Sequence, residues 1–184
     1  VSMVVARRWL PDRPVHVVVI GAGPQGRAHC EALRAIAPGR VASLTLVARS
    51  APDAADPWFD ETDVRAASPG ELPGLLAAAD LVVCATTSEE PLFDAGLVRD
   101  GSLVVAIGSH TPDARELQAA LLGRSQVVVE DPATALREAG DVVLAVGEGA
   151  LAPEELVALT DVVRGRVPLA GDRPVVFKTT GMSW

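Results

Sequence analysis

Aromatic residues are scarce in this sequence, at 3% of 184 residues, and tyrosine is absent. Hydrophobic residues still make up 49% of the chain, so valine, alanine, leucine and isoleucine must build the interior. This composition is typical of a buried parallel sheet packed against alanine-rich helices. The length fits one domain, or one domain with a short appendage, and allows a substantial core.

Cysteine is nearly absent as well. Cys30 and Cys84 are the two cysteines, and they lie far apart in different expected elements. Their spacing does not fit a disulfide framework or a metal cluster, so we predict no metal site. We interpret both as small buried hydrophobic residues in a reducing environment.

The sequence also lacks clustered positive charge. The net charge is -8, and the acidic residues are spread along the chain. Nucleic acids and anionic membranes bind clustered lysine and arginine, so neither is an expected partner. There is no secretory signal and no apolar run near the roughly 18 residues of a membrane span, which predicts a cytoplasmic protein. An anionic cofactor is compatible with this charge, because backbone N–H groups can hold a phosphate within an acidic protein.

Short β-branched runs alternate with segments rich in alanine and leucine. Most of the runs are apolar without alternation, which is typical of strands covered on both faces. The expected strands are Val15–Ile20, Ser43–Val47, Leu81–Ala85, Ser102–Ile107, Gln126–Val129, Val142–Val146 and Val175–Lys178. The expected helices are Pro24–Ile36, Pro69–Ala79, Asp113–Leu122, Thr134–Ala139 and Pro153–Val163, preceded by a helical stretch from Ser2 to Leu10.

The alternation of strands and helices predicts an α/β fold. We expect a Rossmann-type doubly wound, mostly parallel sheet with helices on both faces. Pro52 and Pro57 interrupt the pattern between Ser50 and Val64, so a loop with one helical turn is expected there. The glycines and prolines of Arg164–Pro174 predict a long connection before the last strand.

The strongest local motif is Gly21-Ala22-Gly23-Pro24-Gln25-Gly26, which follows an apolar strand and opens a helix. In that context the G-x-G-x-x-G pattern predicts a dinucleotide-binding turn. Gly21 permits the tight turn, Gly23 lets the backbone approach a pyrophosphate, and Gly26 lets the helix pack closely on the strand. Pro24 and Gln25 begin the helix whose free N–H groups face the phosphates. The alternative is a glycine-rich turn without a ligand.

The end of the second strand predicts the choice of coenzyme. An acidic residue there would bind the ribose 2′-hydroxyl of NAD. The sequence instead has Arg49 and Ser50, which can pair with and donate a hydrogen bond to a 2′-phosphate. This favours NADP(H) over NAD(H). An ordinary solvated arginine at a strand end is the alternative.

Six further stretches have an order and spacing that are similar to those of a known family. The stretches are Gly21–His29, Ala79–Pro91, Val105–Leu117, Val127–Asp131, Ala135–Asp141 and Val176–Gly181. The chain resembles the ornithine cyclodeaminase / mu-crystallin family from about Val1 to Trp184. No single stretch is decisive, but the ordered series is specific.

The resemblance implies that residues 1–184 are an NAD(P)-binding Rossmann domain inserted into a second domain, which binds substrate and forms a homodimer. Residues 1–10 would be the linking helix from that second domain. The substrate-binding arginine and lysine of the family, and an acidic residue, would then lie outside this chain. The start at Val1 without Met fits either a piece of a longer protein or an unusual start codon in a shortened gene.

The resemblance also implies roles for two loops. Ala85-Thr86-Thr87-Ser88 follows a central strand and would lie beside the cofactor, where its hydroxyls can bond ribose or phosphate; a turn capped by these hydroxyls is the alternative. Ile107-Gly108-Ser109-His110 follows the next strand, where the nicotinamide ring would lie.

Candidate catalytic residues are His110 and Lys178. The ornithine cyclodeaminases have an aspartate that matches His110 and a lysine that matches Ala114. Histidine can still transfer a proton near neutral pH, although a solvent-facing loop histidine without a role is the alternative. Lys178 can neutralise charge on cofactor or substrate, or merely cover the end of the sheet. His29, on the first helix after the glycine turn, is expected to pack or cap rather than to act on substrate.

These observations predict an oxidoreductase that acts on an amino acid or cyclic imino acid, as a ketimine reductase, amino-acid dehydrogenase or cyclodeaminase. The cofactor carries the hydride, and the 184 residues alone would be inactive. A non-catalytic NADP(H)-binding module is the alternative. Another Rossmann dehydrogenase, of the shikimate dehydrogenase or glutamyl-tRNA reductase type, would share the glycine motif but not the stretches toward the carboxyl terminus.

Overall fold

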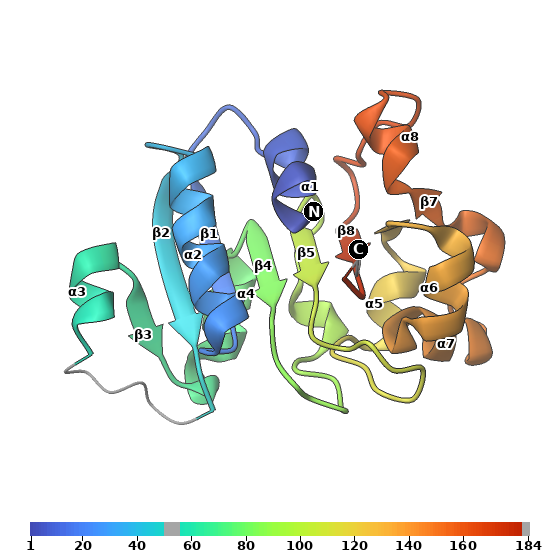
Figure 1. Cartoon of the computed structure of the whole chain (residues 1–184), viewed down its shortest axis with the longest axis horizontal. Helices are drawn as coiled ribbons and strands as arrows, with labels where there is room; N and C mark the ends of the chain where they lie inside the picture. Colours follow the sequence, from blue (N-terminus) through green and yellow to red (C-terminus); the bar gives the residue numbers. More distant parts are fainter. Residues whose placement is uncertain (50–55, 182–184) are drawn as a thin grey trace.

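The computed structural model describes residues 1–49 and 56–181 (Figure 1). Its centre is an eight-stranded sheet with the order β3-β2-β1-β4-β5-β8-β6-β7. Every neighbouring pair of strands is parallel. The doubly wound parallel sheet expected from the sequence is therefore confirmed.

The strands and helices alternate along most of the chain. The strands are β1 (Val15–Ile20), β2 (Val41–Val47), β3 (Arg65–Ala67), β4 (Leu81–Cys84), β5 (Leu103–Ala106), β6 (Gln126–Val129), β7 (Val157–Ala158) and β8 (Val175–Lys178). The helices are α1 (Ser2–Trp9), α2 (Pro24–Ile36), α3 (Pro57–Thr62), α4 (Leu72–Ala78), α5 (Ala119–Gly123), α6 (Pro132–Glu138), α7 (Gly140–Gly147) and α8 (Leu159–Val163). Short 3-10 helices are η1 (Pro69–Glu71), η2 (Ala95–Leu97) and η3 (Pro153–Glu155).

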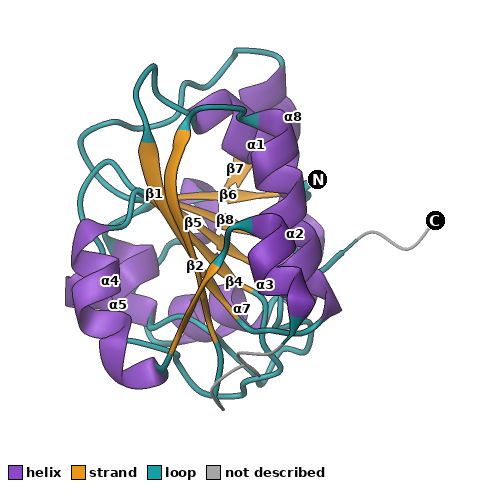
Figure 2. Cartoon of the chain, turned by 90° about the vertical axis from the view of Figure 1, so that its left-hand side faces the viewer, coloured by secondary structure: helices purple, strands orange, loops and turns teal. Residues whose placement is uncertain are grey.

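Helices cover both faces of the sheet (Figure 2). Side chains that point to one face, such as Val17 and Val19, pack with the buried residues of α1, α2 and α8. Their neighbours Val18 and Ile20 pack on the other face with α4, α5, α6 and α7. Because successive strand residues point to opposite faces, strands buried in this way need apolar residues at every position. This requirement explains the uninterrupted valine runs.

One expected strand, Val142–Val146, is wrong: the segment lies in helix α7. Asp141, Val142 and Ala145 are its buried residues besides the first glycine, and their spacing is that of one helix face. Gly140 begins the helix where a Cβ would lie 1.9 Å from the Ala114 carbonyl oxygen. Of the three valines in this segment, Val142 is buried and Val143 and Val146 are half-buried, so they pack one helix rather than a strand of the sheet.

Two expected helices are also only partly correct. In Asp113–Leu122, only the part from Ala119 is helical, because the N–H groups of Glu116 and Leu117 donate to another segment of the chain. In Pro153–Val163, β7 pairs with β6 and separates η3 from α8. Strand β3 was not expected. Helix α3 supplies the helical turn expected before Val64, and Arg164–Pro174 holds no helix or strand.

All carboxyl ends of the parallel strands lie at one edge of the sheet. The chain leaves β1 toward β2 on one side, whereas β4 lies on the other side of β1. A crevice forms at the carboxyl edge where the strand order reverses in this way, and it is the usual ligand site of such sheets. None of the described helices is long and apolar enough to cross a membrane.

Candidate functional site

The turn between β1 and α2 contains three glycines, two of which lie against neighbouring backbone while the third faces open space. Gly21 has φ of +112°, and a Cβ on it would lie 2.3 Å from the Ala85 carbonyl oxygen. A Cβ on Gly26 would lie 1.8 Å from the Gly21 carbonyl oxygen. Gly21 and Gly26 therefore allow the turn and the helix to pack closely, as the sequence predicts.

Gly23 is different, because a Cβ on it would meet nothing within 4 Å. It is the N-cap of α2, Pro24 is in the first turn, and no side chain of residues 1–49 or 56–181 caps the helix. The first N–H groups of a helix need external partners, and the helix dipole adds positive potential there. The space above Gly23 and these donors together fit a phosphate group.

A cleft of about 540 Å³ opens beside this turn. A cleft of this size is typical of ligand sites. It lies between the glycine turn, the end of β2 and the loop after β4, which is the crevice expected from the strand order. Its lining residues include Gly21, Ala22, Gly23, Ala48, Arg49, Leu72, Ala85, Thr86, Thr87, Ser88 and Leu92.

Arg49 lies on the wall of this cleft at the end of β2 and is exposed. Ser50, its expected partner in binding a 2′-phosphate, lies outside the described residues. Gln25 is also exposed, next to Pro24 in the first turn of α2.

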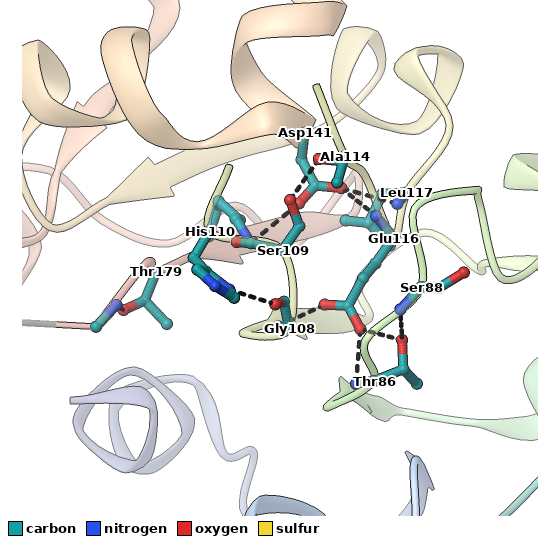
Figure 3. Close-up of polar contacts among 12 residues, drawn as sticks. Thr86, Ser88, Gly108, Ser109, His110, Ala114, Glu116, Leu117, Asp141 and Thr179 are labelled. Carbon is teal, nitrogen blue, oxygen red and sulfur yellow. Dashed lines mark hydrogen bonds and ion pairs between the residues drawn. The ribbon is translucent and has the colours of Figure 1, made fainter. Parts of the chain in front are cut away.

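The loops after β4 and β5 meet on the carboxylate of Glu116 (Figure 3). Thr86 donates its N–H, at 2.9 Å, and its hydroxyl, at 2.8 Å, to Oε1. Gly108 donates its N–H to Oε2 at 2.7 Å. Thr86 therefore has both donors engaged inside the protein, and its hydroxyl also accepts from the Ser88 N–H at 3.2 Å. Thr87 is the exposed hydroxyl of this loop.

A second buried network lies behind the loop after β5. The side chain of Lys178, the one lysine of the chain, ends in a 3.0 Å ion pair with Asp141, and both side chains are 0% exposed. Lys178 also donates to the Ser109 carbonyl oxygen at 2.5 Å. The Ser109 hydroxyl is buried and donates to the Ala114 carbonyl oxygen. The hydroxyl of Ser109 and the ammonium of Lys178 thus shape the loop from behind, and the structure does not support direct contact of Lys178 with substrate.

His110 follows these residues and is exposed. Its Nδ1 lies 3.1 Å from the Gly108 carbonyl oxygen. A carbonyl oxygen can only accept, so the shared proton lies on Nδ1, and Nε2 of the neutral ring is free to take up a proton. Of the candidate catalytic residues, His110 has the accessible geometry.

His29 is a buried link between two helices. Its Nδ1 donates to the Gln25 carbonyl oxygen at 2.7 Å, so its Nε2 accepts from the Ser2 hydroxyl, also at 2.7 Å. Burial lowers the pKa of His29 below its ordinary value. This packing role agrees with the expectation from the sequence. A smaller hollow of about 280 Å³ lies beside it and reaches Ile107 and Thr179.

The sequence reasoning missed Glu116 and Asp141 as organising residues. Glu116 is 0% exposed and Asp141 1% exposed. In the sequence, Glu116 directly precedes Leu117 and Asp141 directly precedes Val142. A single acidic residue beside an apolar segment was the local signal that could have indicated a buried carboxylate. Among the described residues, no group of three histidine, cysteine or acidic side chains is placed to hold a metal ion.

The family model of the ornithine cyclodeaminase/mu-crystallin family matches residues 1–184. The chain belongs to this family. The resemblance that the sequence motifs indicate is thereby confirmed, and a shikimate dehydrogenase or glutamyl-tRNA reductase relationship is not needed to explain the glycine motif.

Individual relatives agree with this assignment. Delta(1)-pyrroline-2-carboxylate reductase 1 of Burkholderia multivorans is 37% identical over 177 residues, which are 94% of this chain and 53% of the relative. The structure of a probable ornithine cyclodeaminase from Bordetella pertussis is 33% identical, with a TM-score of 0.83 over 98% of this chain and 58% of that one. The iminosuccinate reductase of Paracoccus denitrificans, solved in complex with NAD+, shares the fold at 24% identity, with a TM-score of 0.86 over 99% of this chain and 56% of that one. The chain thus spans about half the length of these relatives.

Proposed function

We propose that this chain is the nicotinamide-dinucleotide-binding part of an oxidoreductase that acts on a cyclic imino acid. The observation that supports the cofactor most directly is the open space above Gly23 at the uncapped start of α2. An adjacent cleft of about 540 Å³ can take the rest of a dinucleotide. A bound nicotinamide would supply or accept the hydride.

The chain's own residues bind and orient this group. The first N–H groups of α2 hold the pyrophosphate over Gly23, with Pro24 and Gln25 forming the helix start. Ala85 and Thr87 line the cleft from the loop after β4. The nicotinamide end is expected beside Ile107 and Gly108, which directly follow β5. The Thr86 N–H and hydroxyl, and the Ser109 hydroxyl and carbonyl oxygen, are engaged within the protein, so these groups shape the two loops rather than bind the cofactor.

His110 is the candidate acid/base of the chain. With the Nδ1 proton donated to Gly108, Nε2 can take up a proton or, in the imidazolium, release one. An imine must be protonated on nitrogen to accept a hydride at carbon, which is the task of a general acid. The substrate class rests on the reductase named above, which is similar to this chain over 94% of its length.

We propose that most substrate contacts come from residues outside this chain, with His110 as this chain's own contribution. We propose that residues 1–10 link the domain to a substrate-binding part that also forms a homodimer. Within the described part, α1 packs through Val5 and Ala6, both 0% exposed, while Val4 is 45% exposed. Turnover by the 184 residues alone is not expected.

Arg49 favours NADP(H) over NAD(H) because its exposed guanidinium can pair with a 2′-phosphate. Arg49→Ser should weaken NADPH binding by about tenfold, which corresponds to ~1.4 kcal/mol, and leave NADH binding within about twofold. Arg65→Ser, at the start of β3 and outside the lining of the cleft, is the matched control. A wild-type chain that prefers NADH would contradict the role given to Arg49.

Calorimetric titration of NADPH and NADH against this chain tests the proposed function. We expect saturable binding of at least one coenzyme with 1:1 stoichiometry. Failure to bind either at millimolar concentration would refute the proposal for the isolated chain. A complete protein that binds coenzyme but reduces no cyclic imine would instead favour a non-catalytic binding module.

A further inference from the structure

The carboxylate of Glu116 lies at the meeting point of two loops that start from neighbouring strands. Its side chain is fully buried, yet no cation pairs with it among the described residues. Its partners are the N–H and hydroxyl of Thr86, after β4, and the N–H of Gly108, after β5. A buried carboxylate is costly unless hydrogen bonds compensate it, so these three contacts must persist in the folded protein.

These contacts continue the sheet beyond its last backbone bonds. The Ala85 N–H donates to the Ile20 carbonyl oxygen, and the Ile107 N–H donates to the Cys84 carbonyl oxygen. The following donors of the two loops, on Thr86 and Gly108, turn to the Glu116 carboxylate instead. Where the two loops leave the sheet, the Glu116 carboxylate thus accepts the backbone N–H groups that a neighbouring strand would otherwise accept.

The loops are also packed without room for adjustment. A Cβ on Gly108 would lie 2.0 Å from the Thr86 carbonyl oxygen and 2.5 Å from Glu116 Oε1. Protein interiors resist such overlap, because neighbouring atoms cannot yield by this much. Only glycine at position 108 therefore allows the two loops to lie as close together as their hydrogen bonds to the Glu116 carboxylate require.

Glu116 itself is held from its other end. Its backbone N–H and that of Leu117 both donate to Asp141 Oδ1 at 2.8 Å. Asp141 belongs to α7 and is paired with Lys178 at the end of β8. Through these contacts α7 and β8 fix the position of Glu116, and its carboxylate in turn fixes the loops after β4 and β5.

We propose that Glu116 is the positioning residue of the nicotinamide end of the cofactor site. It fixes the loop that carries Thr87 against the loop that carries Ile107 and His110. This inference rests on the proposed function, because it assumes that these loops receive a nicotinamide. Glu116 is too deeply buried to touch the cofactor, so it acts through the loops alone.

Glu116→Gln is the informative variant because it preserves shape. A carboxylate accepts at both oxygens, whereas an amide must present an N–H to either Thr86 or Gly108. One loop is therefore released whichever way the amide turns. Released loops should match the nicotinamide half less well. Gly23, at the start of α2, and Arg49, at the end of β2, should still hold the adenine half, although the loop after β4 also lines that cleft.

The test compares a dinucleotide with its adenine half in the same protein. For the coenzyme that wild type prefers, we measure the Kd of NADPH against adenosine 2′,5′-bisphosphate, or of NADH against ADP. Glu116→Gln should weaken the dinucleotide by about tenfold and its fragment by less than about twofold. Glu155→Gln is the matched control, since Glu155 also accepts a backbone N–H, that of Ala152, but on the surface; both Kd values should stay unchanged.

Amide hydrogen exchange provides a reading without ligand. The Gly108 N–H should exchange slowly in wild type and at least about tenfold faster in Glu116→Gln. If that variant fails to fold, Thr86→Val removes one of the three donors and should shift the dinucleotide Kd two- to threefold in the same direction. Equal weakening of dinucleotide and fragment, or unchanged binding with unchanged exchange, would overturn the proposal. Wild type that binds no nucleotide would refute the proposed function, while the exchange rates would still report whether Glu116 holds the loops.

Discussion

Two alanine substitutions in the glycine turn should separate coenzyme binding from folding. At Gly23 an added Cβ meets nothing within 4 Å, and at Gly26 it lies 1.8 Å from the Gly21 carbonyl oxygen. Both glycines belong to the same motif, but the motif gives them different roles, and their surroundings differ accordingly. We expect Gly23→Ala to lose binding and keep stability, and Gly26→Ala to lose both.

The magnitude for Gly26 follows from the overlap. Carbon and oxygen atoms need more than 3 Å, so α2 must move away from β1 by more than 1 Å. Overpacking of this kind costs about 1–3 kcal/mol, and a fixed backbone partner favours the upper end of that range. Alanine has a higher helix propensity than glycine, which offsets about 1 kcal/mol of this cost. A net loss of about 2 kcal/mol corresponds to a Tm lower by roughly 4–8 °C for a chain of this length.

Gly23 has no such constraint, because its φ of -70° and ψ of 179° suit any residue. Alanine is a poorer N-cap than glycine by up to about 1 kcal/mol, but it also restricts the unfolded chain by about 0.4–1 kcal/mol. The Tm should therefore stay within about 3 °C. The methyl group occupies the space proposed for the pyrophosphate, so coenzyme affinity should fall at least tenfold.

Thermal unfolding followed by circular dichroism and calorimetric titration of the preferred coenzyme measure the two effects. Gly74→Ala is the control, since Gly74 lies in α4 and its added Cβ also meets nothing within 4 Å. That variant should gain about 1 kcal/mol and bind normally. Wild-type affinity in Gly23→Ala, or a wild-type Tm in Gly26→Ala, would refute the reasoning.

Three further predictions concern buried ionisable groups. Burial opposes the charge on Asp80, but hydrogen bonds from Arg13, the His16 N–H and Arg99 hold the pKa of Asp80 below the usual range. The ionised Asp80 therefore stabilises the fold above about pH 4. This stabilisation is lost as the pH falls through the lowered pKa of the folded state. Asp80→Asn should lower the free energy of unfolding at pH 7 by about 1.5–3 kcal/mol. The free energy of unfolding of this variant should also fall less steeply than that of wild type as the pH is lowered below about 4, and an equally steep fall would contradict this. Lys178→Met should cost about 3–5 kcal/mol in urea denaturation, because it leaves a buried acid unpaired, and a loss below 1 kcal/mol would contradict the buried pair. Burial raises the pKa of both cysteine thiols, that of Cys30 to about 12, so neither should react with a thiol reagent at pH 8 until the chain unfolds.

Local periodicity and the glycine motif predicted the central strands and the tight glycine turn between β1 and α2 correctly, because both depend on neighbours in sequence. The valines of β1 and β4 are buried on both faces, as an unbroken apolar run indicates. The glycine turn needs only the strand before it and the helix after it. These are the parts of the fold that local sequence determines.

The errors occur where tertiary contacts override local preference. Val142–Val146 is rich in valine, which favours a strand, yet it lies in α7, where Val142 and Ala145 are buried in the same cluster as residues of α5 and α6. Glu116 and Leu117 give their N–H groups to Asp141, which prevents the helix expected there. The hydroxyl of Thr86 was a candidate to bond ribose or phosphate, or to cap the turn; it donates instead to a carboxylate 30 residues later in the chain, and it accepts from the Ser88 N–H. No local pattern reports such a distant partner.

The position of β8 has a consequence for the order in which the sheet assembles. The last strand of the chain, Val175–Lys178, lies between β5 and β6, so it divides the strands made before it into two groups. During synthesis the group from β1 to β5 can form early, while β6 and β7 have no edge to join until residues 175–178 leave the ribosome. Such late pairing of distant segments is slow and exposes apolar strand edges. The nascent protein should therefore depend most on chaperones in the interval just before β8 emerges.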